Sequence, residues 1–417
     1  MSDTSFPLPM RWLTLIGLGE DGPAGLSDEA RQRVAAAPIV YGGARHLELV
    51  APLITGEAHS WLSPLDRSIE HLLARRGQPV VVLASGDPFW FGIGATLSRF
   101  VPAAEMQVMP SPSAFSLAAA RLGWPLQEAT VLSLHGRPID LIRPHLHPGR
   151  KIIALTSDAG SPGQIAALLT NLGFGRSKLT LLEAMGGPRE RVTIHKADAF
   201  VSDAVDALNV LAIEVASDGA ARIIPYTSGL DDALFSHDGQ ITKREVRAMT
   251  LSALAPRHGE LLWDIGAGSG SIAIEWLLAD PSLRAIAVEA VPQRAERIRE
   301  NAGNFGVPGL TLVEGTAPQA LMGLPQPDAI FIGGGGSEAG VMEAAKAALK
   351  PGGRLVANGV TTEMEAVLLA EYSSHGGSLT RIDIARVTAI GTMHGWRPAM
   401  PVTQWCWTKP ETTETAE

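Results

Sequence analysis

The chain has 417 residues, more than one ordinary hydrophobic core accommodates, so we expect two domains. Hydrophobic residues make up 46% and charged residues 18%, a balance that excludes a disordered protein. The net charge of -9, with no basic run against it, argues against nucleic acid as a partner. The single cysteine, Cys406, excludes an intramolecular disulfide and a cysteine-cluster metal site. We therefore expect a cytoplasmic protein without a bound metal, a signal peptide or a membrane span.

The first half of the chain alternates between strand-like and helix-like segments, which indicates an α/β fold. Residues 13–19 predict a strand that runs into a glycine turn, and residues 26–37 predict the helix that follows. The apolar run over 80–88 predicts a second buried strand, which ends at a Ser-Gly-Asp-Pro turn. Further strands are expected over 152–155, 178–182 and 210–215.

An irregular stretch over residues 216–240 contains Ser-Asp-Gly, a proline and paired aspartates. Such composition is typical of a linker, so we place a domain boundary near residue 218. The expected domains are therefore 1–218 and 219–417. The two halves share no alignable repeat, which indicates a fusion rather than a duplication.

The second domain opens with a helix-like segment over 244–255 and a glycine-rich loop after a strand over 261–265. A dinucleotide-binding loop would have glycine at position 271, where this chain has Ser271. The alternating glycines instead favour S-adenosylmethionine (SAM), and Glu289, at the end of the next strand, is placed to accept the ribose hydroxyls. A glycine turn without a cofactor is the alternative. The loop residues are Gly266, Ala267, Gly268, Ser269 and Gly270.

Strands and helices continue to alternate through the second domain. Helices are expected over 292–305 and 337–349, with strands over 285–288, 310–313, 329–332 and 354–357. The last two expected strands, 379–389 and 402–407, have no helix between them. An antiparallel pair after five βα units is typical of the SAM-dependent Rossmann variant.

Beyond these patterns, the motifs of both halves resemble known families. The first half resembles the tetrapyrrole methylases of the cobalamin pathway, through Gly17–Gly19, Ser85–Pro88, Pro110–Ser116, Ala118–Gly123 and Glu183–Gly187. The second half resembles the decarboxylating precorrin methyltransferase domain, through Gly239–Glu245, the loop at 264–270, Glu314–Ala320, Ile332–Gly335 and Leu349–Arg354. In this order the two domains resemble the fused precorrin-6Y C5,15-methyltransferases.

The resemblance implies an α/β protein with a two-lobed tetrapyrrole methylase (class III methyltransferase) fold followed by a SAM-dependent Rossmann-like (class I methyltransferase) domain. It implies a SAM-dependent C-methyltransferase and decarboxylase of cobalamin biosynthesis. The first domain would methylate C5 of precorrin-6Y or its reduced form, precorrin-6B. The second would methylate C15 and remove the carboxyl group of the ring C acetate, giving precorrin-8. A cobalt-precorrin substrate, a methyltransferase acting on another substrate, and a tetrapyrrole carrier without turnover remain alternatives.

The resemblance also carries cofactor contacts onto this chain. In the first domain these are Leu18, Asp87, Ser113 and Ala114. In the second domain Thr242 and Ala317 join the loop glycines and Glu289 as expected SAM contacts. Asp87 alternatively caps its own turn, and Thr242 alternatively caps the helix that follows it. No catalytic residue is assigned, because methyl transfer to a nucleophilic meso carbon depends mainly on orientation and water exclusion.

The substrate's acetate and propionate groups call for local positive charge in an acidic protein. One basic stretch comprises Arg137, Arg143, His145, His147, Arg150 and Lys151, and a second comprises Arg381, Arg386, His394 and Arg397. Solvated surface charge is the alternative for both stretches. Glycines 333–336 either leave room for the flat macrocycle or form a simple turn. By analogy with its relatives, the protein is expected to be a homo-oligomer.

Overall fold

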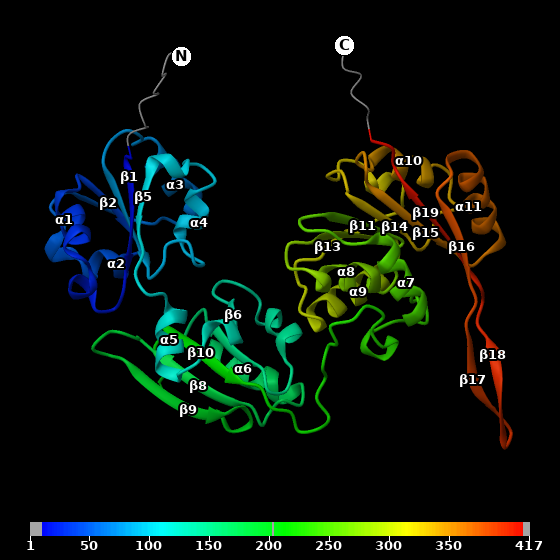
Figure 1. Cartoon of the computed structure of the whole chain (residues 1–417), viewed down its shortest axis with the longest axis horizontal. Helices are drawn as coiled ribbons and strands as arrows, with labels where there is room; N and C mark the ends of the chain where they lie inside the picture. The colour runs from blue at the N-terminus through cyan, green and yellow to red at the C-terminus, as the bar shows by residue number, and fades with distance from the viewer. Residues whose placement is uncertain (1–10, 202–203, 412–417) are drawn as a thin grey trace, which may run out of the picture. The chain divides into compact units, whose positions relative to one another are not determined.

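The structure is a computed structural model that describes residues 11–201 and 204–411. The chain divides into two compact units (Figure 1). The first comprises the chain up to Ile139 together with His145–Arg222, and the second comprises Asp140–Pro144 together with the chain from Ile223 onward. The linker-like composition of residues 216–240 predicts a domain boundary near residue 218. Among the described residues, the helices are too short or too polar to cross a lipid bilayer.

The first lobe of the first unit is a parallel five-stranded sheet in the order β3-β2-β4-β1-β5. Every residue of β1, which lies between β4 and β5, is buried, as expected for a parallel sheet covered on both faces. The strands are β1 (Leu13–Leu18), β2 (Ile39–Gly42), β3 (Glu57–Ser60), β4 (Val80–Ser85) and β5 (Met106–Met109). The helices are α1 (Asp28–Ala36), α2 (Ala44–Leu49), α3 (Leu65–Leu73) and α4 (Ile93–Leu97).

The second lobe is a mixed five-stranded sheet in the order β6-β7-β10-β8-β9, in which only β6 and β7 run parallel. The strands expected at 152–155, 178–182 and 210–215 are confirmed to within a residue as β7, β8 and β10. The strands are β6 (Ala129–Ser133), β7 (Lys151–Leu155), β8 (Lys178–Glu183), β9 (Arg191–Lys196) and β10 (Asn209–Glu214), with helices α5 (Ala114–Leu122) and α6 (Ser161–Asn171). The expected two-lobed fold is thus present.

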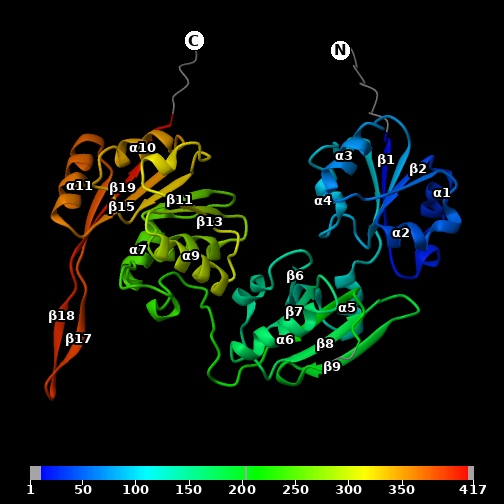
Figure 2. The same ribbon diagram turned by 180° about the vertical axis from the view of Figure 1, so that it is seen from behind.

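The second unit is built on a seven-stranded sheet in the order β13-β12-β11-β14-β15-β19-β16 (Figure 2). The first five strands are parallel, and β19 pairs antiparallel with both β15 and β16. The strands are β11 (Leu261–Ile265), β12 (Arg284–Glu289), β13 (Thr311–Glu314), β14 (Ala329–Ile332), β15 (Arg354–Gly359), β16 (Ser378–Ile382) and β19 (Val402–Thr408). The helices are α7 (Arg244–Leu254), α8 (Ser271–Ala279), α9 (Pro292–Asn304), α10 (Val341–Ala348) and α11 (Thr362–His375).

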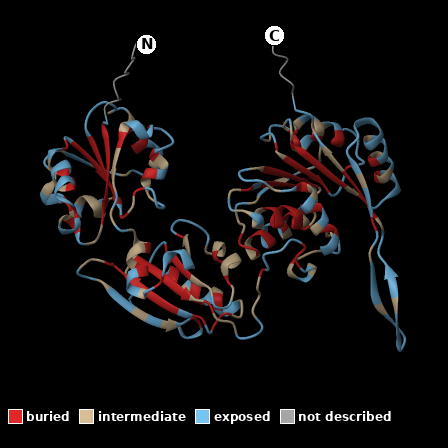
Figure 3. Ribbon diagram, in the orientation of Figure 1, coloured by how far each residue is buried: buried red, intermediate tan, exposed pale blue. Residues whose placement is uncertain are grey.

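Side chains of β11, the middle of the five parallel strands, alternate between two hydrophobic layers, as the pleat of a strand requires. Leu261, Trp263 and Ile265 pack with residues of α10 and α11, and Leu262 packs on the opposite face with residues of α7 and α8. Asp264 shares the second face. In Figure 3 the buried residues follow the inner strands of the three larger sheets.

The single strand expected over 379–389 is wrong. Residues there form β16 and then β17 (Ala385–Ile390), which pairs with β18 (Met393–Pro398) in a separate two-stranded hairpin (Figure 1). The strand divides at residues 383–384. The two-residue loop Gly391-Thr392, where Gly391 has a φ of 60°, then reverses the chain and lets β18 pair with β17. The antiparallel arrangement of β16 and β19 is confirmed.

Candidate functional site

The glycine loop lies between the end of β11 and the start of α8. Gly266, Gly268 and Gly270 all have left-handed φ values, of 68°, 60° and 73°. The backbone N–H groups of Gly266 and Ala267 both donate to the carbonyl oxygen of Val288, at 3.0 and 3.1 Å. The loop is therefore anchored to β12, the neighbouring strand.

Close neighbours leave little room for side chains at these glycines. A Cβ atom at Gly266 would lie 2.4 Å from the carbonyl oxygen of Gly334, and one at Gly270 would lie 3.0 Å from Ile298. A Cβ at Gly268 would lie 3.1 Å from the carbonyl oxygen of Gln240. Such a bare backbone loop at a helix N-terminus is suited to a nucleoside ligand.

Glu289 lies where the sequence predicts it, at the end of β12 and beside the loop. Its buried carboxylate accepts hydrogen bonds from Gly268 N–H at Oε2 (2.8 Å) and from Val291 N–H at Oε1 (2.9 Å). A carboxylate has about four lone-pair positions, so both oxygens can still accept ribose hydroxyls. The geometry fits the expected role.

Asp264 is a site residue that the sequence analysis did not single out, although it closes the apolar run before the loop. Its Oδ2 accepts from Ala273 N–H (3.1 Å), while its buried Oδ1 has no hydrogen-bond partner among the described residues. Burial, with a smaller contribution from Glu289, raises the pKa of Asp264 to about 7. Ser269 Oγ is also buried without a described partner. Unpaired buried acceptors fit a ligand that brings hydrogen-bond donors, such as the ammonium group of SAM.

Thr242 and Ala317 flank the loop region in sequence. Helix α7 begins at Arg244 with Lys243 as its N-cap and no side-chain cap, so the capping alternative for Thr242 is wrong. The extended backbone of Lys243 separates Thr242 from the helix, and the Thr242 carbonyl instead accepts from the Arg247 guanidinium. Ala317 lies after β13, partly buried at the edge of the core.

A cavity of about 910 Å³ is the prominent feature of the first unit. Three of the four expected contacts, Leu18, Ser113 and Ala114, line it. Ser113 also caps α5, accepting from Ser116 N–H at 3.1 Å. Asp87 is not among the lining residues, and its Oδ1 accepts from Phe89 N–H (2.8 Å), which confirms its turn-capping role. The cofactor role of Asp87 stays a prediction.

Aromatic side chains form part of the cavity wall, and sequence reasoning did not find them. Trp90 and Phe91 are 49% and 47% exposed, unusual for side chains of this size, and they lie edge to face with ring centroids 6.0 Å apart. Phe115 beneath them is fully buried. Exposed aromatic faces beside a cavity are suited to a flat, conjugated ligand. The aromatic lining residues are Trp61, Phe89, Trp90, Phe91 and Phe115.

A polar cluster lies at another side of the cavity. Arg45 Nη2 lies 2.9 Å from His46 Nε2 and donates to Ser85 Oγ at 3.0 Å, and it forms an ion pair with Glu20 through its other nitrogen. Burial, followed by the charge of Arg45, lowers the pKa of His46 to about 4. The imidazole is therefore neutral at physiological pH.

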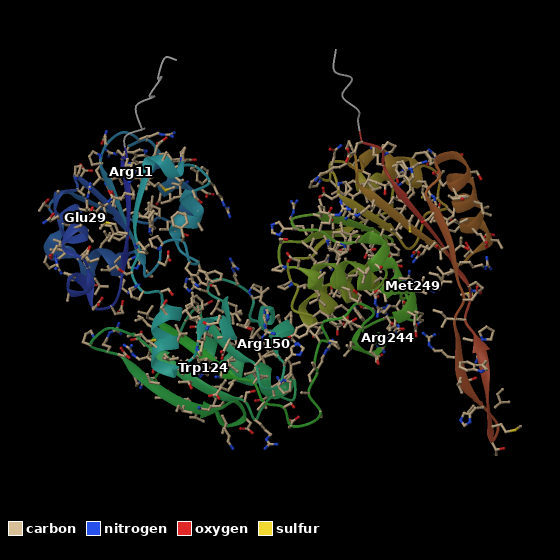
Figure 4. The ribbon with its side chains drawn as sticks, in the orientation of Figure 1. Arg11, Glu29, Trp124, Arg150, Arg244 and Met249 are labelled. Carbon is tan, nitrogen blue, oxygen red and sulfur yellow. The ribbon has the colours of Figure 1, made fainter. Side chains whose placement is uncertain are left out.

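Several residues of the two expected basic stretches already have partners within the protein. Of the first, only Arg137 lines the cavity. Arg143 pairs with Asp140 at 2.6 Å. The Nζ atom of Lys151 lies over the ring of Trp124, 5.1 Å from the ring centroid. Trp124 and Arg150, another residue of this stretch, are labelled in Figure 4. In the second stretch, Arg381 pairs with Glu365 and Arg386 with Glu245.

The glycines after β14 are mostly packed rather than open. Gly334 lies against Gly266, and a Cβ at Gly336 would lie 2.5 Å from the terminal methyl of Met364. Only Gly335, with a φ of 71°, has open space around its Cβ position. Close packing, rather than room for a macrocycle, accounts for Gly336 and for Gly333, where a Cβ would lie 2.7 Å from Cε1 of Phe331.

Comparison with known proteins gives matches over both units. The family described as tetrapyrrole (corrin/porphyrin) methylases matches residues 12–200, and the family described as precorrin methyltransferase domain matches residues 233–409. A protein of Sinorhizobium sp named precorrin-6Y C(5,15)-methyltransferase (decarboxylating) is 68% identical over 398 residues, which are 95% of this chain and 96% of that protein. These matches confirm the resemblance that the motifs indicated.

Two Salmonella typhimurium proteins each match less than half of the chain. One, named cobalt-precorrin-6B C(15)-methyltransferase (decarboxylating), is 33% identical over 179 residues, 42% of this chain and 92% of that protein. The other, named cobalt-precorrin-7 C(5)-methyltransferase, is 29% identical over 180 residues, 43% of this chain and 88% of that protein.

Proposed function

The chain belongs to the precorrin-6Y C5,15-methyltransferases (decarboxylating), and from this we infer that it methylates a precorrin at C5 and C15 and removes one carboxyl group as carbon dioxide in cobalamin biosynthesis. The observation that carries this function is the 68% identity to the Sinorhizobium protein over nearly the whole of both chains. The intact glycine loop and the cavity of the first unit support it. A carrier without turnover would also need a cavity, but it would have no need of a glycine loop suited to a nucleoside ligand.

We propose SAM as the methyl donor at two sites, one in each unit. When bound, SAM supplies an electrophilic methyl group on a sulfonium. In the second unit, the backbone of Gly266–Gly270 would hold the methionine part, Glu289 the ribose hydroxyls, and Ala317 and Thr242 further parts of the ligand. In the first unit, Leu18, Ser113 and Ala114 would line the cofactor site within the cavity.

The chain's own contribution to methyl transfer is orientation and water exclusion. Because the rings of Trp90 and Phe91 are nearly perpendicular, one would stack on the face of the macrocycle and the other would contact its edge. Apolar lining residues would keep water from the sulfonium. Decarboxylation needs an electron sink, which the conjugated macrocycle itself supplies once protonated. The second unit therefore has to position its substrate rather than supply a strong catalyst.

We further propose that the first unit carries out C5 methylation and that the second carries out C15 methylation with decarboxylation. The two Salmonella relatives support this division, because each is named for one of the two reactions and matches less than half of this chain. We also propose a cytoplasmic homo-oligomer; light scattering on the purified protein would test its oligomeric state, and cell fractionation its location. Exposed Ile390, Met393 and Trp396 on the β17–β18 hairpin support self-association.

The test is mass spectrometry of metal-free reduced precorrin-6 after incubation with SAM, for the wild type and two variants. Gly268→Arg fills the glycine loop of the second unit, and Ala114→Trp fills the cofactor side of the first cavity. The wild type should add two methyl groups and lose carbon dioxide. Ala114→Trp should add one methyl group and lose carbon dioxide, whereas Gly268→Arg should retain the carboxyl group.

Mixing the two variants gives a matched control. If each unit is intact in one variant, the mixture should restore the second methyl group and the loss of carbon dioxide. Conversion of only the cobalt-bound substrate would assign the protein to the cobalt-containing route. Binding of SAM without any change in either substrate would contradict the proposed function.

A further inference from the structure

Methylation of a meso carbon releases one proton, because a hydrogen on that carbon is replaced. The proposed C5 reaction of the first unit therefore requires a proton acceptor beside the cavity. Its titratable lining residues in the described part of the chain are Glu20, Arg45, His46, Arg99, His135 and Arg137. The three arginines stay protonated and cannot accept a proton.

Glu20 and His46 are already engaged by cations. The Glu20 carboxylate pairs with Arg45 and lies 3.8 Å from Arg189. A guanidinium can only donate, so the contact between Arg45 and His46 occupies the lone pair on His46 Nε2. Ser85 Oγ also lies within hydrogen-bond distance of this nitrogen, at 2.9 Å, which leaves less room there for a substrate. Both groups are therefore poor acceptors for a substrate proton.

His135 differs from both because its hydrogen bond fixes the useful tautomer. It lies just after β6, and its Nδ1 is 3.0 Å from the carbonyl oxygen of Thr156. A carbonyl can only accept, so Nδ1 carries the hydrogen and the neutral ring has its lone pair on Nε2. Nε2 has no hydrogen-bond partner among the described residues. The exposed ring thus presents a free acceptor at the cavity wall.

The backbone around His135 is held on both sides. Gly136 N–H donates to Ser157 Oγ at 3.0 Å, and that hydroxyl donates to the Leu134 carbonyl at 3.0 Å. The loop that carries the ring is thereby tied to the end of β7. A positioned imidazole of this kind is typical of a general base.

We propose that His135 is the catalytic base of C5 methylation. C5 donates an electron pair to the methyl carbon and forms the new carbon–carbon bond. The bond between the methyl carbon and sulfur breaks, and its electron pair stays on sulfur. C5 then carries both hydrogen and methyl. Its hydrogen passes as a proton to His135 Nε2, the carbon–hydrogen electron pair restores the conjugation, and the imidazolium releases the proton to solvent.

The experiment compares full-length wild type, His135→Gln and His46→Gln with reduced precorrin-6 and SAM, and counts methyl groups over time by mass spectrometry. His135→Gln should perform C15 methylation and decarboxylation as the wild type does, but add the C5 methyl ~100-fold more slowly or worse. Added imidazole should restore part of that rate. Calorimetric titration with SAM should find its first-unit site unchanged.

Wild-type C5 rates in His135→Gln would overturn the proposal. So would a loss of C5 methylation that is accompanied by lost SAM binding and is not rescued by imidazole, because that pattern indicates a structural role. A loss rescued by imidazole in His46→Gln, with His135→Gln active, would transfer the role to His46. Failure of the wild type itself to methylate C5 would instead contradict the proposed function.

Discussion

At the scale of single residues, the buried carboxyl group of Asp264 links the SAM site to pH. Its pKa of about 7 in the folded protein lies above the value of about 3.9 expected in an unfolded chain. Between these values the folded state binds the extra proton, so its stability falls as pH rises from about 4 to about 7. Ionisation of Asp264 should lower the free energy of unfolding by up to about 4 kcal/mol relative to the protonated form.

Asp264→Asn removes this ionisation while keeping an oxygen for Ala273 N–H. We expect the difference in free energy of unfolding, variant minus wild type, to be larger at pH 8 than at pH 5. Denaturant unfolding of both proteins at the two pH values, in the absence of SAM, measures the difference. A stability difference that is the same at both values would show that Asp264 ionises normally.

Two arginines that line the first cavity lack an ion-pair partner among the described residues. Arg99 and Arg137 are both exposed, unlike Arg45, which pairs with Glu20. Free guanidinium groups are suited to the substrate's carboxylates. Arg99→Gln and Arg137→Gln should each raise the KM of C5 methylation about fivefold with little change in kcat, as loss of a solvent-exposed charge contact predicts.

The control for these variants is Arg176→Gln, since Arg176 is exposed in the same unit but lies away from the cavity. Steady-state kinetics at two salt concentrations would distinguish a contact with the substrate from a general effect of protein charge. Equal effects of all three substitutions would indicate only a general change in protein charge.

At the scale of elements, the glycine loop and the loop after β14 provide a matched pair of substitutions. Gly266 and Gly335 have nearly equal φ values, of 68° and 71°. A Cβ at Gly266 would meet the Gly334 carbonyl, whereas a Cβ at Gly335 meets nothing within 4 Å. Gly335→Ala should therefore lower the free energy of unfolding by about 1–2 kcal/mol through backbone strain alone. Gly266→Ala should lower it clearly more and should also abolish SAM binding in the second unit.

Thermal unfolding and calorimetric titration with SAM test this pair. Equal destabilisation by the two substitutions would mean that the contact with Gly334 relaxes without cost, and that only the left-handed backbone conformation matters at Gly266.

The elements that the sequence predicted well are those with long apolar runs bounded by glycine or charge. The strands at 261–265 and 329–332 are confirmed to the residue, because buried parallel strands produce nearly continuous apolar sequences, interrupted here only by Asp264. The hairpin after Ile382 was missed because its exposed strands, 385–390 and 393–398, have no continuous apolar face. Its turn signal, Gly391-Thr392, was nevertheless present in the sequence.

At the scale of the whole molecule, the candidate site of the second unit was easier to predict than that of the first. Gly266, Gly268, Gly270 and Glu289 lie within two adjacent βα units, so local spacing is enough to find them. The first cavity draws on strands and loops far apart in sequence, from Leu18 in β1 to Val210 in β10. Its aromatic wall and His135 have no motif of their own, and only the paired lobes bring them together.

The division into two compact units leads to a prediction about SAM stoichiometry. If each unit holds its own cofactor, calorimetric titration should find two SAM molecules per chain in the wild type, and one in either Gly268→Arg or Ala114→Trp. The doubly substituted protein should bind none. Because a ligand at 100 times its Kd stabilises the state that binds it by about 2.7 kcal/mol, each remaining SAM should raise the unfolding temperature of its own unit only. A single SAM per wild-type chain would mean that one unit acts without its own methyl donor.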